Sequence, residues 1–316
     1  MHELDLLPVG GGKRSGDAFA LRFTRPDTGG LAHVTIDAGY QAEGAALAEH
    51  VRSRFGTRRL DLAILTHPDP DHIGGMGILL RTLEVETLWI HRLHDREADH
   101  AAGRLDMARA VRDVVAAAER RGTRVVEPWA GMEALGGALR VLGPDRAFYS
   151  ALVAEEARRR DAPRPPLPLL LLREGWDRLL ARLPWEVRFD DYEGTSPRND
   201  SSVILALELP GFRALLPADA GVPALHRALD VLAGPRRPAG PLELVVVPHH
   251  GSRFNASSEL LDRMLGPIGA APPGPAFVSA GKGSPLHPTR RVVRAYERRG
   301  RTVSVTAGRV LRHTGR

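Results

Sequence analysis

The segment 67–72 reads His-Pro-Asp-Pro-Asp-His and places four potential metal ligands within six residues. Two imidazoles and two carboxylates on so short a loop cannot all be buried without compensation, because buried charges lose their hydration and like carboxylates repel. A divalent cation removes that cost, since it neutralises the carboxylates and takes imidazole nitrogens as ligands. Gly74 and Gly75 follow and let the backbone turn closely into the next element. We therefore expect a metal-binding loop at His67, Asp69, Asp71 and His72.

Four further polar groups lie at the ends or entrances of apolar runs. They are the Asn-Asp-Ser-Ser segment at 199–202, Asp219, the His-His-Gly-Ser segment at 249–252, and His287 before Pro288. Each has a structural alternative, since 199–202 can form a turn and cap, Asp219 can cap a helix, and His287 can precede one. His249 and His250 are harder to explain in this way. Adjacent residues at an extended strand end face opposite ways, so one of the two imidazoles is expected to point into a site.

These polar residues need a scaffold that brings strand ends together. Apolar runs predict strands at 18–23, 33–36, 60–65, 87–90, 124–126, 139–142, 203–209, 214–216, 242–247, 276–279 and 303–306. Helical spacing predicts helices at 42–55, 73–83, 105–115, 222–232, 257–265 and 289–299. Alternation of strands and helices predicts a layered α/β fold, in which loops leaving one edge of a sheet can share a site.

Residues 145–198 differ from the rest of the sequence in composition, and we interpret them as an insertion or lid within a single domain spanning residues 1–316. This stretch holds a charged helical segment at 154–160, a proline-rich passage at 163–168, and four aromatic residues. Large aromatic side chains usually pack small cores, so we expect them to pack the insertion rather than to contact substrate. The aromatic residues are Trp176, Trp185, Phe189 and Tyr192.

Composition excludes several classes of protein. The 316 residues contain no cysteine, so disulfides, thiolate metal sites and cysteine nucleophiles are absent. No apolar run reaches the length of a membrane span, and the N-terminal residues do not resemble a signal peptide, so we expect a cytoplasmic protein with no membrane association. The formal net charge is +6, which suits either a polyanionic partner or a general bias toward arginine.

Taken together and in this order, the motifs resemble the metallo-β-lactamase superfamily. Within it they are similar to the ComEC-like branch, the hydrolase domain of bacterial DNA-uptake proteins and its stand-alone relatives. That branch typically reads Ser/Thr-His-Pro-Asp-x-Asp-His-x-Gly-Gly, then Asn-Asp-Ser-Ser, Leu-Leu-x-x-Asp, His-His-Gly-Ser and a late His-Pro. The matching segments here begin at Thr66, Asn199, Leu215, His249 and His287.

The resemblance implies a four-layer αββα sandwich and a site for two divalent metal ions, zinc or manganese, with magnesium also possible. His67 and Asp69 would bind the first metal, Asp71, His72 and His249 the second, and Asp219 would bridge the two. A histidine usual in the superfamily is missing near Asn199, which makes the first site richer in oxygen and leaves single-metal occupancy open. Residues that would serve as weaker ligands or contact the ligands are Asn199, Asp200, Ser252 and Asp37.

For a metal-dependent hydrolase of this kind the expected substrate is a phosphodiester, and the ComEC-like resemblance implies DNA. Two metals roughly 3.5–4 Å apart activate water and stabilise both oxygens of a displacement. Asp71 or Asp69 would orient the water, and His250 or His287 would donate a hydrogen bond to the substrate or protonate the leaving group. A basic stretch beside His287 is expected to contact the DNA backbone, with cations at Arg290, Arg291, Arg294, Arg298, Arg299 and Arg301.

Two other functions are compatible with the same residues. A pocket covered by Trp176, Trp185 and Tyr192 would favour a small-molecule phosphodiester, ester or lactone hydrolase over a nuclease. A non-catalytic module that binds nucleic acid or another partner is the third interpretation, although such a module would be expected to lose ligands such as Asp71, His72 or Asp219.

Overall fold

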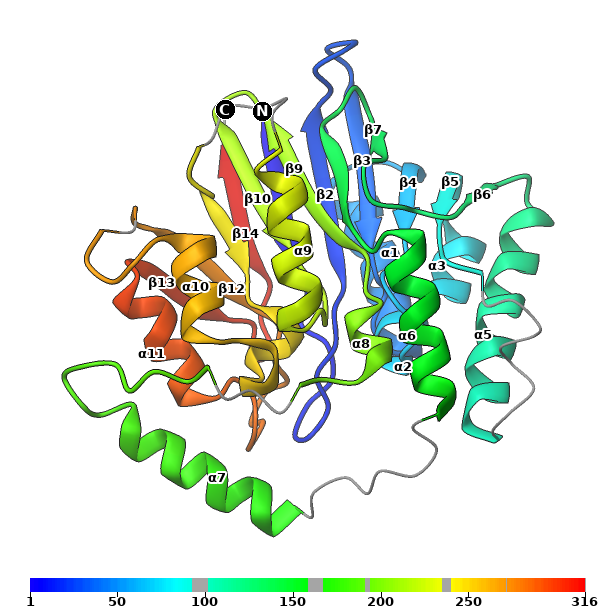
Figure 1. The fold of residues 1–316 in the computed structure, drawn as a ribbon. Helices are drawn as coiled ribbons and strands as arrows, with labels where there is room; N and C mark the ends of the chain where they lie inside the picture. The colour runs from blue at the N-terminus through cyan, green and yellow to red at the C-terminus, as the bar shows by residue number, and fades with distance from the viewer. Residues whose placement is uncertain (93–101, 159–166, 191–193, 235–239, 271, 316) are drawn as a thin grey trace.

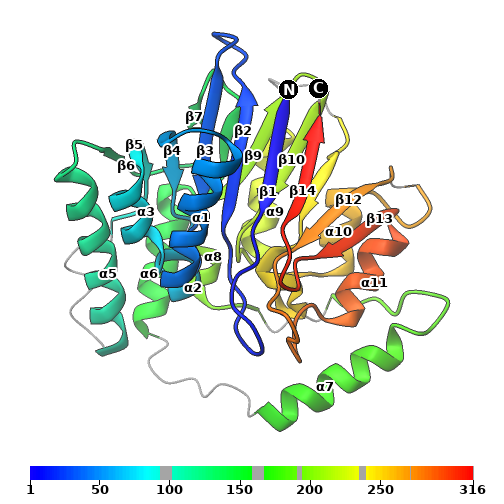
Figure 2. The same cartoon turned by 180° about the vertical axis from the view of Figure 1, so that it is seen from behind.

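Two seven-stranded β-sheets pack face to face and carry helices on their outer surfaces in the computed structural model (Figures 1 and 2). The structure describes residues 1–92, 102–158, 167–190, 194–234, 240–270 and 272–315. The first sheet has the order β14 (Leu311–Gly315), β1 (His2–Leu6), β2 (Phe19–Thr24), β3 (Leu31–Ile36), β4 (Arg59–Ile64), β5 (Glu84–Trp89) and β6 (Arg124–Val126). The second has the order β13 (Arg301–Val305), β12 (Gly274–Val278), β11 (Leu244–Val246), β10 (Phe212–Leu216), β9 (Ile204–Leu209), β8 (Leu139–Gly143) and β7 (Glu133–Ala134).

Each sheet is half parallel and half antiparallel. Strands β3 to β6 run parallel in the first sheet, and β10 to β13 run parallel in the second. The remaining neighbours pair antiparallel. Parallel strands present their carboxyl ends at one edge, where ligands of open α/β sheets usually bind. The predicted ligands follow β4, β10 and β11, all three of which belong to these parallel halves.

Three apolar layers hold the four-layer sandwich together. Between the sheets, side chains such as Leu21 and Phe23 pack with Leu205 and Leu216. The outer face of the first sheet is covered by α1 (Gln41–Arg54), α3 (Met76–Thr82) and α5 (Ala102–Glu119). The outer face of the second sheet is covered by α9 (Val222–Leu232), α10 (Ser258–Leu265) and α11 (Arg290–Arg298). The predicted αββα fold is therefore confirmed.

Strands β1 and β14, an adjacent pair in the first sheet, were not among the predicted strands. Glu3 and Asp5 of β1 are buried and interrupt its apolar pattern. Their carboxylates are neutralised by cations from other elements, with Arg22 at 2.6 Å from Glu3 and Arg312 at 2.7 Å from Asp5. Burial of the strand depends on these tertiary ion pairs, which a local pattern cannot reveal.

The helix predicted at 73–83 is instead two helices, α2 (Pro70–Ile73) and α3. The break lies at Gly74 and Gly75, where the chain packs directly on neighbouring backbone. A Cβ on Gly75 would lie 2.2 Å from the Ala38 carbonyl oxygen. The two glycines therefore allow a close approach that turns α2 toward the strand ends.

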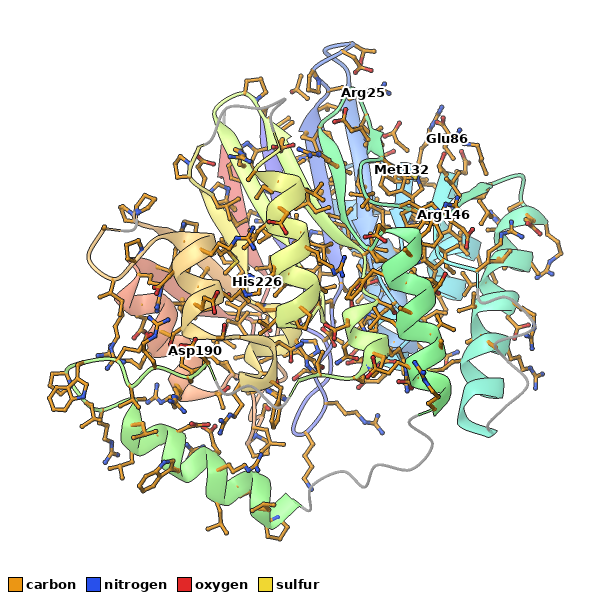
Figure 3. All side chains as sticks on the ribbon, viewed as in Figure 1. Arg25, Glu86, Met132, Arg146, Asp190 and His226 are labelled. Atoms are coloured by element: carbon orange, nitrogen blue, oxygen red, sulfur yellow. The ribbon has the colours of Figure 1, made fainter. Side chains whose placement is uncertain are left out.

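The described part of residues 145–198 forms α6 (Arg146–Arg158), α7 (Leu167–Leu180) and the first half of α8 (Pro197–Asp200). Figures 1 and 2 show α7 set apart from the sandwich, on the side where α2 and α8 lie. Asp190, labelled in Figure 3, accepts a hydrogen bond from the Glu259 backbone nitrogen at 2.8 Å and so fastens the end of this stretch to α10. None of the described helices is long and apolar enough to cross a membrane.

The aromatic side chains of this stretch behave differently from one another. Phe189 is buried in the core of the second sheet, as the packing interpretation predicts. Trp176 and Trp185 are 61% and 63% exposed, so they neither pack the insertion nor cover a pocket. Tyr192 lies outside the described residues, as do 159–160 of the predicted charged helix and most of the proline-rich passage.

Four of the six expected DNA-contacting arginines are turned inward, whereas Arg290 and Arg294 are exposed, so the predicted basic surface along this stretch is reduced to these two. Arg299 and Arg301 are buried, and Arg291 donates to the carbonyl oxygens of residues 187 and 188. Arg299 lies 2.8 Å from Glu186 and 2.6 Å from Asp262. Arg291, Arg298 and Arg299 hold the 183–190 segment against α10 and α11, because arginine can satisfy several acceptors at once. Arg301 instead donates to the Leu242 carbonyl oxygen.

We predict that Arg299→Ala lowers the free energy of unfolding by about 3–5 kcal/mol, since it leaves buried carboxylate oxygens without their cation. Chemical denaturation followed by circular dichroism measures the change. The matched control is Arg294→Ala, because Arg294 is exposed and pairs only with the exposed Glu297, and it should change the value by less than about 0.5 kcal/mol. Equal effects of the two substitutions would contradict the structural role of Arg299.

Candidate metal centre

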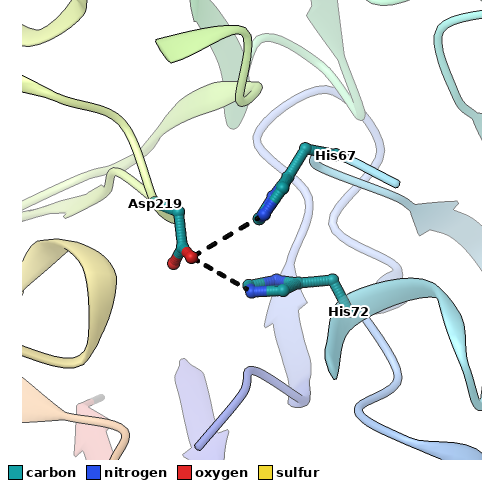
Figure 4. A group of neighbouring side chains, drawn as sticks. All are labelled: His67, His72 and Asp219. Atoms are coloured by element: carbon teal, nitrogen blue, oxygen red, sulfur yellow. Dashed lines mark ion pairs between the residues drawn. The ribbon is translucent and has the colours of Figure 1, made fainter. Parts of the chain in front are cut away.

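The carboxylate of Asp219 lies at the centre of four imidazoles. It follows β10 and is almost fully buried. Its Oδ2 atom lies 3.7 Å from His67 Nε2, 3.6 Å from His72 Nε2 and 3.4 Å from His249 Nε2, and its Oδ1 atom lies 3.8 Å from His250 Nε2. Figure 4 shows His67 and His72 directed at this carboxylate from the opposite sheet. The helix-cap alternative for Asp219 is wrong, because the N-cap residue of α9 is Gly221.

Asp37 orients the metal-binding loop from beneath. The register of β3 and β4 pairs Ile36 with Ile64, which places Asp37 beside Thr66. Its Oδ1 accepts from the Thr66 backbone nitrogen at 2.8 Å, and its Oδ2 accepts from Thr66 Oγ1 at 2.7 Å. The same Oδ2 lies 2.7 Å from His72 Nδ1. A carboxylate on Nδ1 fixes the ring and leaves Nε2 directed at Asp219, as is usual for metal-binding histidines.

The imidazoles of His249 and His250 both reach the site, which corrects the expectation that the two rings face opposite ways. Neither residue is extended. They have φ values of 47° and 57°, in the left-handed region, within the short helix η1 (Pro248–Gly251). His250 Nε2 also lies 3.6 Å from Asp71 Oδ2. His249 Nδ1 lies 2.8 Å from Asn255 Oδ1, so its Nε2 is the atom that faces Asp219.

The donor atoms fit divalent metal ions. Three overlapping sets among the described residues bring three ligand atoms within 4.8 Å of one another, and all three contain His72. They are His67, His72 and Asp219; Asp71, His72 and His250; and Asp17, Asp37 and His72. Several of these atoms are buried and have no hydrogen-bond partner among the described residues. They are His67 Nε2, His72 Nε2, His250 Nε2 and Asp219 Oδ1. Buried polar atoms are normally paired, so this convergence indicates a place for a cation.

Electrostatics within the site follow from burial and close charges. Burial opposes ionisation of Asp71, but His72 and His250 outweigh it and lower the pKa of Asp71 to about 2. Burial likewise opposes protonation of His250, but Asp219 and Asp71 raise its pKa to about 9. Burial raises the pKa of Asp17 to about 6. The carboxylates of Asp71 and Asp219 are therefore ionised at neutral pH and attract positive charge to the site.

Asp69 lies at the edge of this cluster and is shared with Arg198. Its Oδ2 is 3.9 Å from His67 Nε2, while its Oδ1 accepts from Arg198 Nη1 at 2.9 Å. Arg198 also donates to Glu156 of α6 at 3.0 Å. Asp69 is thus near the first ligand group and is held by a cation from α8. Its predicted role as a ligand stays a prediction.

The Asn-Asp-Ser-Ser segment contributes the last two residues of α8 and lies beside His249. Asn199 Nδ2 is 3.4 Å from the His249 ring nitrogens, and its Oδ1 accepts from Ser196 Oγ at 2.9 Å. Asp200 Oδ1 accepts from the Gly221 nitrogen at 2.9 Å, which fixes the loop that carries Asp219. An imidazole from η1 therefore lies where the sequence lacks the usual histidine.

The two remaining predicted residues lie on the outer side of His249. Ser252 Oγ accepts from the Phe254 nitrogen and caps the short helix η2 (Arg253–Asn255). The His287 ring centroid lies 6.0 Å from that of His249 and 6.4 Å from that of His250. Burial and these two imidazoles lower the pKa of His287 to about 3, and its Nδ1 has no hydrogen-bond partner among the described residues.

Three residues of the site were not predicted from the sequence. Asp17 Oδ1 lies 3.6 Å from His250 Nδ1, Arg198 holds Asp69, and Asn255 orients His249. Asp17 directly precedes a predicted strand, a placement shared by no other candidate acid. Arg198 directly precedes the predicted segment 199–202, so its place in the sequence could have identified it as a site residue. Asn255 has no sequence signal beyond its closeness to His249.

The fold and this centre agree with comparisons to known proteins. The family model of the metallo-beta-lactamase superfamily matches residues 28–274, and the chain belongs to this superfamily. No curated protein matches the sequence. The donor set and fold together define a metallo-β-lactamase-fold metallohydrolase with buried histidine and aspartate clusters suited to divalent metal.

Solved structures with a similar fold have low sequence identity. A diphosphatase of the PhnP family is 10% identical with a TM-score of 0.44, over 100% of this chain and 98% of the other. A metallo-beta-lactamase-like protein from Thermotoga maritima is 16% identical with a TM-score of 0.33, over 44% of this chain and 65% of that chain. A metallo-beta-lactamase from Hirschia baltica is 18% identical with a TM-score of 0.22, over 40% of this chain and 48% of the other.

We predict that Asp37→Asn weakens metal binding about 10–100-fold, because the amide replaces the charged partner of His72 while its size is unchanged. Isothermal titration of the metal-free protein with Zn²⁺ or Mn²⁺ measures the affinity. Asp61→Asn serves as the control, since Asp61 lies at the other end of the strands and, among the described residues, accepts only from the His33 backbone nitrogen. Unchanged affinity in Asp37→Asn would show that this carboxylate does not support the ligands.

Proposed function

We propose that this chain is a ComEC-like metallohydrolase that cleaves phosphodiester bonds in DNA. The observation that carries the proposal is the Asp219 carboxylate, buried among four imidazoles, three of which (His67, His72 and His250) have Nε2 atoms without hydrogen-bond partners in the described part of the chain. The order of motifs from Thr66 to Pro288 supports the ComEC-like assignment. A phosphodiester is the substrate class for which a site with two cations is best suited, since both reacting oxygens carry negative charge.

The ligand atoms divide into two groups around Asp219. His67 and His249 would hold one cation with Asp219, and Asp71, His72 and His250 would hold the other. Four imidazoles make this set richer in nitrogen than the sequence predicts, which favours zinc or manganese over magnesium. When bound, such cations polarise a phosphoryl oxygen and activate water as a nucleophile at neutral pH.

Polar residues of the site that lie outside the two ligand groups would position the water and the substrate. Asp69 lies at the edge of the ligand group and is fixed by Arg198, so its carboxylate can accept a hydrogen bond from the attacking water. His287 has an unpartnered Nδ1 and lies outside the ligand groups, so it can hydrogen-bond to a substrate oxygen. His250 is enclosed by Asp17, Asp71 and Asp219, which suits a ligand better than a proton donor to the leaving group.

A small cavity favours one alternative, a hydrolase of small molecules. The cavity holds about 130 Å³ and lies beside His249 and His287, with Phe254 and Leu286 in its wall and α7 on its outer side. An apolar wall next to the centre would accommodate the compact aryl or alkyl group of an ester or diester, which leaves as a phenol or an alcohol. The activity test must therefore include small esters and diesters as well as DNA.

We predict that protein loaded with Mn²⁺ or Zn²⁺ degrades DNA and that Asp219→Asn lowers the rate at least about 100-fold with loss of bound metal. The screen crosses Mn²⁺, Zn²⁺ and Mg²⁺ with single- and double-stranded DNA, a simple phosphodiester and a lactone, and elemental analysis gives the metal content. Asp113→Asn is the matched control, because Asp113 is exposed and lies on α5.

The outcomes separate the possible functions. Cleavage of small esters or diesters with every nucleic acid left intact would show that the DNA assignment is wrong. A folded wild-type protein that takes up no metal would support the non-catalytic module instead. Loss of both metal and activity in Asp219→Asn, with both retained in Asp113→Asn, would support the metallohydrolase.

A further inference from the structure

The chain contains only two lysines, Lys13 and Lys282, and the structure brings them together. The other 42 of its 44 basic residues are arginines. Lys13 lies in the loop between β1 and β2, and Lys282 follows β12. The two loops pair directly, since Gly11 forms a parallel bridge with Lys282 and the Gly12 nitrogen donates to the Lys282 carbonyl oxygen at 2.9 Å. A general bias toward arginine does not explain why the only two lysines lie on loops that pair with each other, although the loops come from opposite ends of the sequence.

The paired loops are fixed to the metal centre at their base. The Gly281 nitrogen donates to Ser15 Oγ at 3.1 Å, and the Asp17 nitrogen donates to the Asp71 carbonyl oxygen at 3.2 Å. Glycine is required for this packing, because a Cβ on Gly281 would lie 2.1 Å from the Arg14 carbonyl oxygen. Asp17 then contacts His250 within the centre. The position of both lysines is thus set relative to the ligands.

Both lysine side chains are exposed, and neither forms an ion pair with any residue that the structure describes. Two arginines close to the ligands are different: Arg198 pairs with Asp69 and Glu156, and Arg291 pairs with Asp177. Arg14, next to Lys13, is also exposed, and its guanidinium carbon lies 5.6 Å from the centroid of the Tyr40 ring. Figure 1 shows the β1–β2 loop, in dark blue, projecting from the sandwich on the side of α2, α8 and α7. The lysines therefore provide uncommitted positive charge at the rim of the site.

We propose that Lys13 and Lys282 form a rim that binds a phosphate group next to the one being cleaved. The proposal rests on the proposed phosphodiesterase function and defines its substrate class as a strand with consecutive phosphates. An ammonium group on a flexible stem is a compact point charge that can follow phosphates whose spacing varies, whereas a guanidinium prefers one planar geometry. A diester with a single phosphate would occupy the metal centre and leave the rim empty.

A binding measurement in the absence of metal tests the rim directly. Fluorescence anisotropy of a labelled single-stranded 20-nucleotide DNA in EDTA compares the wild type with the Lys13→Ala/Lys282→Ala double variant. We expect the dissociation constant to rise about tenfold, and the slope of log affinity against log salt to fall by roughly 0.7 for each lost phosphate contact. The control is Arg120→Ala/Arg121→Ala, which removes two exposed charges at the turn after α5.

A kinetic measurement in the metal-loaded protein tests substrate choice. The double lysine variant should lose about tenfold in kcat/KM toward the oligonucleotide and keep the wild-type value toward bis(p-nitrophenyl) phosphate, which has one phosphate. The proposed phosphate-binding role of the two lysines would be wrong if the double variant kept the wild-type DNA affinity. It would also be wrong if kcat/KM fell equally toward both substrates. If DNA binding depends on the lysines but the protein cleaves no diester, the proposed lysine rim is supported and the proposed phosphodiesterase activity is wrong.

Discussion

The structure of the site depends on one buried negative charge, the carboxylate of Asp219. A carboxylate removed from water is costly unless it is compensated on several sides. Here the compensation comes from four imidazoles on two separate segments, 67–72 and 249–250, all within 4 Å of its oxygens. The Nε2 atoms of His67, His72 and His250 are buried and find no hydrogen-bond partner among the described residues, so the protein has assembled donors for a cation rather than a closed polar network.

The sandwich fold positions these ligands because, in both sheets, the carboxyl ends of parallel strands lie at the site. His67 and His72 follow parallel strand β4 of one sheet, and Asp219 and His249 follow parallel strands β10 and β11 of the other. The backbone at this edge is unusual. Four of the six non-glycine residues with positive φ in the described part are Asp37, Ala218, His249 and His250, all in or beside the site. Such strain is tolerated where the surrounding packing holds the chain in place.

Positive charge is divided between two tasks in this protein. Most arginines near the centre are used internally: Arg299 holds the 183–190 segment, and Arg198 fixes Asp69. Planar guanidinium groups suit this work because each can satisfy several acceptors. The two lysines remain exposed at the rim and without ion pairs in the part of the chain that is described. Net charge alone would not have separated structural cations from those available to a substrate.

The sequence by itself determined the α/β layering and the ligand loop at 67–72, because apolar periodicity and ligand density are local properties. It also located Asp219, His249 and His287 at the ends of apolar runs. Only the tertiary structure placed the charged strand β1, since burial of Glu3 and Asp5 depends on Arg22 and Arg312 from distant elements. Only the tertiary structure turned both His249 and His250 toward Asp219, because left-handed backbone angles replaced the expected strand alternation. The same is true of Asp17, Arg198 and the paired lysines, whose roles arise from contacts across the fold that no spacing in the chain encodes.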